Sequence, residues 1–114
     1  MSDVRKIQQT PTGTFFVCLP REWAKEHGIP RAFDSYEALI RSGEVDVIYN
    51  PLPNSMHAAW TIMALEAGVP VLCEKPFAID AAEAAEMLAV SKHTGVLLAE
   101  AFMYRFHPIY DHVL

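Results

Sequence analysis

Three short apolar runs, rich in β-branched and aromatic side chains, recur along most of the chain. They cover residues 45–49, 69–73 and 96–99. A stretch with the apolar spacing of a helix precedes each run and ends at a glycine: Gly43, Gly68 and Gly95. Strand starts about 25 residues apart predict right-handed βαβ crossovers and therefore a parallel sheet. Because the runs are almost continuously apolar, we expect helices on both faces of that sheet.

Capping patterns predict where the helices begin. Asp34 with Glu37, and Asp80 with Glu83, have the spacing of a capping box, and Ser55 suits the cap of the helix between them. The Met and Trp positions of that middle helix are assigned to the core. The predicted fold class is α/β, a partial Rossmann-like parallel sheet of three βα units preceded by a short β-hairpin and helix.

Residues 1–27 follow a different pattern. Apolar positions on either side of a Thr-Pro-Thr-Gly turn indicate two short strands, and a short helix is expected from Pro20 to His27, where Gly28 ends it. We therefore divide the chain into a β-hairpin plus short helix, residues 1–27, and an α/β domain, residues 28–114.

Composition excludes several classes of protein. The 114 residues are 52% hydrophobic and 20% charged, with a net charge of −5, so a core is available and disorder is excluded. No apolar run reaches the roughly 20 residues of a membrane span, and the N-terminus lacks a secretory signal. Cys18 and Cys73 lie singly in apolar runs, which favours reduced core thiols and no metal site. We expect a cytoplasmic protein.

Polar clusters follow the carboxyl end of every predicted strand. They are Asn50, Asn54 and His57; Glu74 and Lys75; and Glu100 and Arg105. Open parallel sheets bind ligands outside the carboxyl ends of their strands, so this pattern predicts one shared ligand site. Each cluster also has a structural alternative. Asn54 can be a turn residue, His57 an exposed surface histidine, Glu74–Lys75 a solvated pair, and Arg105 a partner for stacking on its aromatic neighbours.

Three motifs extend beyond these single residues. They are Pro-Leu-Pro-Asn-Ser-Met-His at 51–57, Glu-Lys-Pro at 74–76, and Ala-Glu-Ala-Phe-Met-Tyr-Arg-Phe-His-Pro at 99–108. In this order and spacing they resemble the Gfo/Idh/MocA oxidoreductases, in particular the branch that contains dihydrodiol and xylose dehydrogenases. The resemblance runs from about residue 24 to Leu114. It implies that residues 28–114 are a partial NAD(P)-binding Rossmann domain acting on a sugar or cyclic polyol, with NAD or NADP as cofactor.

The resemblance also implies roles for individual residues. Near the ribose and adenine of the cofactor it places Leu52, Pro53, Asn54 and His57. Glu74 and Lys75 would approach the nicotinamide, and Lys75 matches the active-site lysine of the family. An ammonium is a compact donor suited to orienting an oxygen beside a transferring hydride. Arg105 matches the arginine that follows the third of these strands.

Two departures from the family pattern limit what the chain can do. The Gly-x-Gly-x-x-Gly turn that brings a pyrophosphate to a helix N-terminus is missing, since Gly13 is isolated and the next glycine is Gly28. The second domain, with the substrate-binding sheet, is not expected because the chain stops at Leu114. We expect no turnover from this chain alone. The residue that selects NAD or NADP would lie in a strand the chain lacks.

The N-terminal segment resembles the start of an AbrB-type swapped-hairpin domain over about 25 residues. That resemblance implies dimerisation and a basic DNA-binding face, with Arg5, Lys6 and Arg21 as candidates. Two alternatives to the oxidoreductase therefore stay open: an inactive remnant or fusion product, and a DNA-binding regulator. Because the predicted sheet would keep an unpaired edge, we also expect self-association.

Overall fold

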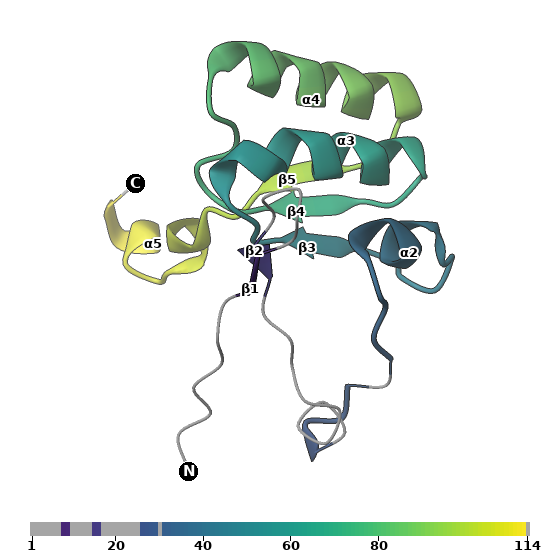
Figure 1. The fold of residues 1–114 in the computed structure, drawn as a ribbon. Coiled ribbons are helices and arrows are strands. Elements are labelled where there is room, and N and C mark those ends of the chain that lie inside the picture. Colours follow the sequence, from purple (N-terminus) through teal and green to yellow (C-terminus); the bar gives the residue numbers. More distant parts are fainter. Residues whose placement is uncertain (1–7, 10–14, 17–25, 30, 114) are drawn as a thin grey trace. The chain divides into compact units, whose positions relative to one another are not determined.

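The computed structural model of the chain describes residues 8–9, 15–16, 26–29 and 31–113 (Figure 1). The chain divides into two compact units, Met1–Ala32 and Phe33–Leu114. Each unit is described by itself below. The functional assignment of the sequence-based segments 1–27 and 28–114 stays a prediction.

The first unit contains two short antiparallel strands. Strand β1 is Gln8–Gln9 and β2 is Phe15–Phe16, with Gln8 opposite Phe16. This pairing is the hairpin expected from the sequence. The helix expected over residues 20–27 is described only at its last two positions. Several residues named above lie outside the described part of the chain: Arg5, Lys6, Gly13, Cys18 and Arg21.

The second unit is built on a three-stranded sheet in the order β3-β4-β5. Strand β3 is Ile48–Asn50, β4 is Val71–Cys73 and β5 is Leu98–Glu100. Both pairs are parallel, which confirms the predicted topology. Each strand begins two or three residues after the start of its apolar run. In the second run the reason is visible, because Val69 still donates its N–H to Ala64 O of the preceding helix at 2.9 Å.

Helices α3 and α4 lie on the same face of the sheet (Figure 1). Helix α3 is His57–Glu66 and α4 is Ala81–Thr94. Two right-handed crossovers that advance in one direction, β3 to β4 to β5, must place their helices on one side. On the other side, Tyr49 is 53% and Leu72 38% exposed. The expectation of helices on both faces is therefore wrong for the described residues.

Shorter helices flank this sheet. Helix α2 is Tyr36–Arg41, and the 3-10 helix η1, Asn54–Met56, leads directly into α3. After β5 come the 3-10 helix η2, Met103–Phe106, and helix α5, Tyr110–Val113. Helix α2 contacts α3 through the rings of Tyr36 and Trp60, whose centroids are 5.1 Å apart in an edge-to-face arrangement.

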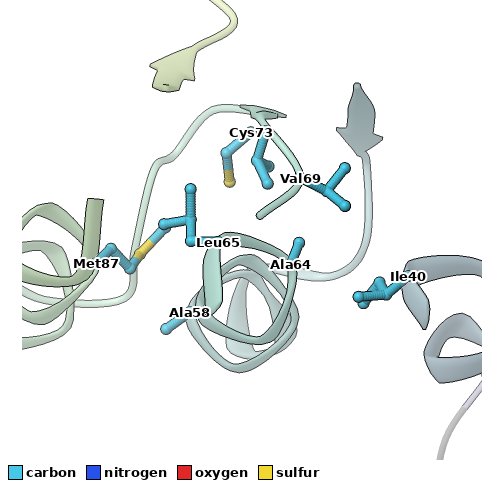
Figure 2. Packing of buried hydrophobic residues seen from close by; sticks show 8 residues of the cluster. Ile40, Ala58, Ala64, Leu65, Val69, Cys73 and Met87 are labelled. Carbon is cyan, nitrogen blue, oxygen red and sulfur yellow. The ribbon is translucent and has the colours of Figure 1, made fainter. Parts of the chain in front are cut away.

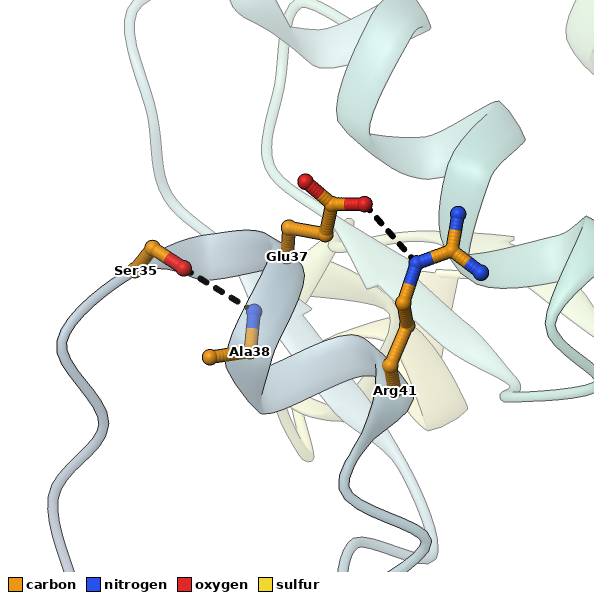
Figure 3. A network of polar contacts seen from close by, with 4 residues as sticks. All are labelled: Ser35, Glu37, Ala38 and Arg41. Carbon is orange, nitrogen blue, oxygen red and sulfur yellow. Dashed lines mark hydrogen bonds and ion pairs between the residues drawn. The ribbon is translucent and has the colours of Figure 1, made fainter.

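The first helix has a different cap from the one expected. Its N-cap is Ser35, whose Oγ accepts the Ala38 N–H at 3.0 Å, so Asp34 is not the cap (Figure 3). Glu37 bonds instead to Arg41 Nε, four residues later, at 2.8 Å. Asp34 and Ser35 are both good caps, and the sequence does not distinguish two adjacent candidates of equal chemistry.

The caps of the other two helices differ in outcome. Asp80 caps α4 as predicted, since its Oδ1 accepts the Glu83 N–H at 2.9 Å. Glu83 returns a bond to the Ile79 N–H at 3.3 Å, one residue before the position expected in a capping box. Ser55 does not cap α3, because the turn of η1 occupies that position and no side chain caps the helix.

The core lies between α3, β4 and α4, and Ile40 of α2 joins it (Figure 2). Leu65, Cys73 and Met87 have no exposed surface. Figure 2 shows Met87 of α4 and Leu65 of α3 pointing toward one another. The contact holds the two helices together above the sheet, and dense packing of this kind is sensitive to any loss of volume.

We therefore expect Met87→Ala to lower the free energy of unfolding by about 2–5 kcal/mol, because it removes buried methylene and sulfur contacts and leaves a cavity. Urea denaturation followed by circular dichroism measures the change. Leu88→Ala is the matched control, since the neighbouring Leu88 on the same helix is 47% exposed. An equal loss in both variants would contradict the proposed core.

Candidate site at the carboxyl edge of the sheet

The three strands end in register. Asn50 of β3, Cys73 of β4 and Glu100 of β5 lie side by side as hydrogen-bonded neighbours in the ladder. The loops that leave these residues therefore start at one edge of the sheet, where open parallel sheets bind their ligands. All three polar clusters predicted from the sequence follow this edge.

His57 joins the first two loops. It is the first residue of α3 and has no exposed surface. Its Nδ1 lies 2.8 Å from Pro76 O, in the loop after β4, and its Nε2 lies 2.6 Å from Leu52 O, in the loop after β3. The alternative that His57 is an exposed surface histidine is wrong. Both ring nitrogens are occupied by backbone oxygens, so the side chain supports the loops from beneath.

Asn50 holds the same region from the end of β3. It is 3% exposed, and its Nδ2 donates to Thr61 Oγ1 at 3.1 Å and to His57 O at 3.3 Å. Its Oδ1 accepts the Leu52 N–H at 3.2 Å. The amide thus fixes the first residues of the loop against α3. No sequence pattern marks Thr61 as part of this site, because a threonine among the apolar residues of a helix indicates no function until its hydrogen-bond partner is known.

Glu74 is held by a residue from the neighbouring strand. The Tyr49 hydroxyl donates to Glu74 Oε1 at 2.6 Å, and the Lys75 N–H donates to Oε2 at 2.9 Å. The bond from Tyr49, and then that from Lys75, lowers the pKa of the Glu74 carboxyl. The same bond to Glu74 raises the pKa of Tyr49. The carboxylate is therefore fixed and charged at neutral pH.

The sequence pattern also does not reveal the polar contact of Tyr49, since the apolar run indicates only a strand residue at this position. Its neighbour in the ladder is Leu72, two residues before Glu74, so only the observed register brings its hydroxyl to the carboxylate.

Lys75 lies directly after Glu74 and is exposed. Among the described residues its ammonium makes no salt bridge. The expected alternative, a solvated Glu74–Lys75 ion pair, is thus not the arrangement observed, because Glu74 takes Tyr49 and the Lys75 backbone as its partners. The ammonium of Lys75 stays available at the edge. The peptide bond that follows, Lys75–Pro76, is cis.

The third cluster is divided. Glu100 Oε1 accepts the Phe77 N–H at 3.1 Å, which ties β5 to the loop after β4. Arg105 lies in η2 and is exposed, beside a hollow of about 400 Å³ that it lines with Tyr104, Tyr110 and Asp111. Within the described residues no hydrogen bond or salt bridge joins Arg105 to the other two clusters. Asn54 is exposed in η1.

A three-stranded parallel sheet with crossover helices and a polar carboxyl edge corresponds to one half of a dinucleotide-binding α/β domain, and other nucleotide-binding α/β folds share it. Comparison with known families agrees. The family model described as an oxidoreductase family with an NAD-binding Rossmann fold, Gfo/Idh/MocA, matches residues 10–102. The chain belongs to this family.

Individual relatives point to the same group. D-xylose 1-dehydrogenase (NADP(+)) 2 of Haloferax volcanii is 50% identical over 86 residues, which are 75% of this chain and 26% of the relative. A trans-1,2-dihydrobenzene-1,2-diol dehydrogenase of Xenopus tropicalis is 39% identical over 82% of this chain and 28% of its own. This chain therefore spans about a quarter of the length of the curated relatives it matches.

Solved structures resemble the fold. KijD10, a 3-ketoreductase from Actinomadura kijaniata in complex with TDP-benzene and NADP, has a TM-score of 0.75 and 38% identity, over 82% of this chain and 29% of that one. A probable dehydrogenase from Thermotoga maritima has a TM-score of 0.76 and 26% identity, over 82% and 28% of the two chains.

The family match begins at residue 10, inside the segment that resembles an AbrB-type hairpin. That second resemblance, and the DNA binding it implies, stay predictions.

None of the helices in the described ranges could cross a lipid bilayer. Cys73 is a free, buried thiol, and burial is the main reason that its pKa is raised.

We expect Tyr49→Phe to raise the pKa of the Glu74 carboxyl, because it removes the hydrogen bond that most stabilises the charged form. A pKa lowered in the folded chain means that this contact stabilises the fold above the ordinary glutamate pKa and that the contribution is lost as pH falls through the lowered value. Carboxyl ¹³C shifts followed against pH by NMR measure the pKa. Tyr36→Phe is the control, since the Tyr36 ring packs on Trp60; an unchanged Glu74 titration in Tyr49→Phe would refute the assignment.

Proposed function

We propose that the chain forms part of the cofactor-binding half of an NAD(P)-dependent oxidoreductase that acts on a sugar or cyclic polyol. The observation that carries the proposal is that hydrogen bonds connect two loops at the carboxyl edge of the sheet. The Pro-Leu-Pro-Asn and Glu-Lys-Pro loops leave neighbouring parallel strands and are joined there by His57. Membership of the family supports the reaction class, and the relatives' names support the substrate class.

In this proposal the residues of the first loop border the cofactor. Leu52, Pro53 and Asn54 follow β3 and are partly or fully exposed, so they are available to the ribose and adenine side. His57 has both ring nitrogens on backbone oxygens, so its contribution passes through the loops rather than through direct contact with the cofactor. Arg105, in the 3-10 helix η2 that follows the third strand, would also border the cofactor.

The second loop would face the nicotinamide end. When bound, the nicotinamide supplies the hydride acceptor or donor. The exposed ammonium of Lys75 would donate a hydrogen bond to the reacting hydroxyl or carbonyl oxygen and orient it, which is the catalytic role we assign to it. The carboxylate of Glu74, fixed by Tyr49, places a negative charge beside that ammonium.

The described residues fit only part of a dinucleotide. The exposed polar groups of the two loops suit ribose and nicotinamide, whereas the chain's five glycines do not form the Gly-x-Gly-x-x-Gly turn that would receive a pyrophosphate. Binding by this chain should therefore be weak, and we propose that it does not turn over by itself. NAD and NADP are both candidates; the NADP named for two relatives favours testing NADPH first.

We expect NADPH, added to millimolar concentration to ¹⁵N-labelled chain, to shift the amide signals of Leu52, Asn54 and Lys75. These residues lie at the carboxyl edge, whereas Gly68 and Gly95 lie where the helices end and should not move. Lys75→Ala should reduce the shifts, and Lys92→Ala, an exposed residue of α4, is the matched control. Shifts confined to other surfaces, or none at all, would reject the proposed site. Binding in the micromolar range would show that the glycine turn is not needed.

We also propose that the chain associates with a second copy through the outer edge of β3. Ile48 N–H and Asn50 O bond toward the β4 side, at 2.9 and 3.0 Å. The N–H and C=O of Tyr49 therefore point to the opposite side, which has no partner strand among the described residues. A hollow of about 280 Å³, lined mainly by apolar side chains such as Leu39, Ile48 and Trp60, adjoins this edge. An uncharged edge of this kind pairs readily with its own copy.

Val47→Lys should shift this association toward monomer, because it places a charge beside the outer edge of β3, where the 59% exposed Val47 precedes the strand. Sedimentation velocity over a concentration series measures the oligomeric state. Ile79→Lys, at a position 58% exposed before α4, is the control. A monomeric unmodified chain would contradict self-association altogether.

We also propose that the protein is cytoplasmic.

A further inference from the structure

His57 is a buried ring between two hydrogen-bond acceptors. Its Nδ1 and Nε2 lie 2.8 and 2.6 Å from carbonyl oxygens, and a carbonyl oxygen can only accept. A neutral imidazole carries one N–H, so one of the two oxygens would face a nitrogen lone pair at hydrogen-bond distance. Only the doubly protonated ring donates to both oxygens at once.

We propose that His57 is a positioning residue whose doubly protonated ring donates to Leu52 O and to Pro76 O and thereby fixes the two loops that present Lys75. The inference rests on the proposed function only in assigning a task to Lys75. The link itself joins two segments 24 residues apart in the chain, and it does so directly beneath the edge.

The surroundings of His57 suit a charged ring. After the bonds from Tyr49 and the Lys75 backbone, the charge of His57 also contributes to lowering the pKa of the Glu74 carboxyl, which lies in the same loop as Pro76. The backbone of His57 is held as well, since its carbonyl oxygen accepts from Asn50 Nδ2 at 3.3 Å. The cost of burying a charge is offset when the group donates two charge-assisted hydrogen bonds.

Other histidines of the chain can serve as references for the spectrum of the His57 ring. The four other histidines are exposed: His27, His93, His107 and His112. Correlation spectra of the ring nitrogens at pH 7 should show protons on both Nδ1 and Nε2 of His57, protected from exchange with water, while the exposed rings of His93 and His112 exchange faster. His57→Gln identifies the signals by their loss. A ring with one unprotonated nitrogen would overturn the proposal.

A positioning role for His57 also predicts which backbone amides exchange faster when its ring is removed. In His57→Gln the amides of Leu52 and Phe77 should exchange with deuterium more than about tenfold faster, since their acceptors, Asn50 Oδ1 and Glu100 Oε1, depend on the loop positions. The Val71 amide, bonded to Leu97 O within the sheet, should change by less than about twofold. His93→Gln is the matched control. Unchanged exchange at both loops would overturn the role; if His57→Gln does not fold, the ring spectra of the unmodified chain decide.

Neither measurement needs a cofactor, so the two proposals fail separately. If NADPH shifts no amide of the unmodified chain, the proposed function fails and the link between the loops is still judged by the ring protons. If NADPH binds, His57→Gln should weaken the shifts at Lys75 and His93→Gln should not. Equal NADPH shifts in both variants would show that fixing the loops does not serve the site.

Discussion

The parallel register of β3, β4 and β5 is the constraint on which the rest of the structure depends. It aligns Asn50, Cys73 and Glu100 at one edge, so that loops from three distant parts of the chain begin side by side. Right-handed crossovers then place α3 and α4 together on one face, and the core of Leu65, Cys73 and Met87 holds them there. The candidate site is a consequence of this alignment.

Polar bonds convert the alignment into a defined arrangement. The edge has two layers. Beneath, Asn50 and His57 hold the loop backbones from a buried position. Above, Tyr49 and Glu74 bond at the surface and leave the Lys75 ammonium exposed. The lower layer has the larger consequence for geometry, because buried polar groups must keep their partners, whereas exposed ones exchange them with water.

The same architecture leaves apolar surface exposed on the second unit. The matched relatives are about three times as long as this chain, since 86 and 93 aligned residues make up only 26% and 28% of their lengths. The outer edge of β3 and the face that carries Tyr49 and Leu72 are apolar and exposed in the described residues. Exposed apolar surface of this kind is characteristic of interaction sites, which accords with the proposed association with a second copy.

The sequence by itself determined the element order, the parallel topology, the family and the polar edge, because apolar periodicity, glycine stops and three spaced motifs are local properties. It also determined the Asp80 cap, whereas the choice between Asp34 and Ser35, and the turn that displaced Ser55 as a cap, were decided by the backbone path. Tertiary structure alone decided that both crossover helices share a face and that Tyr49 meets Glu74. It also decided that His57 lies between two carbonyl oxygens. Each of these depends on register and distance between segments far apart in the chain, which no local pattern encodes.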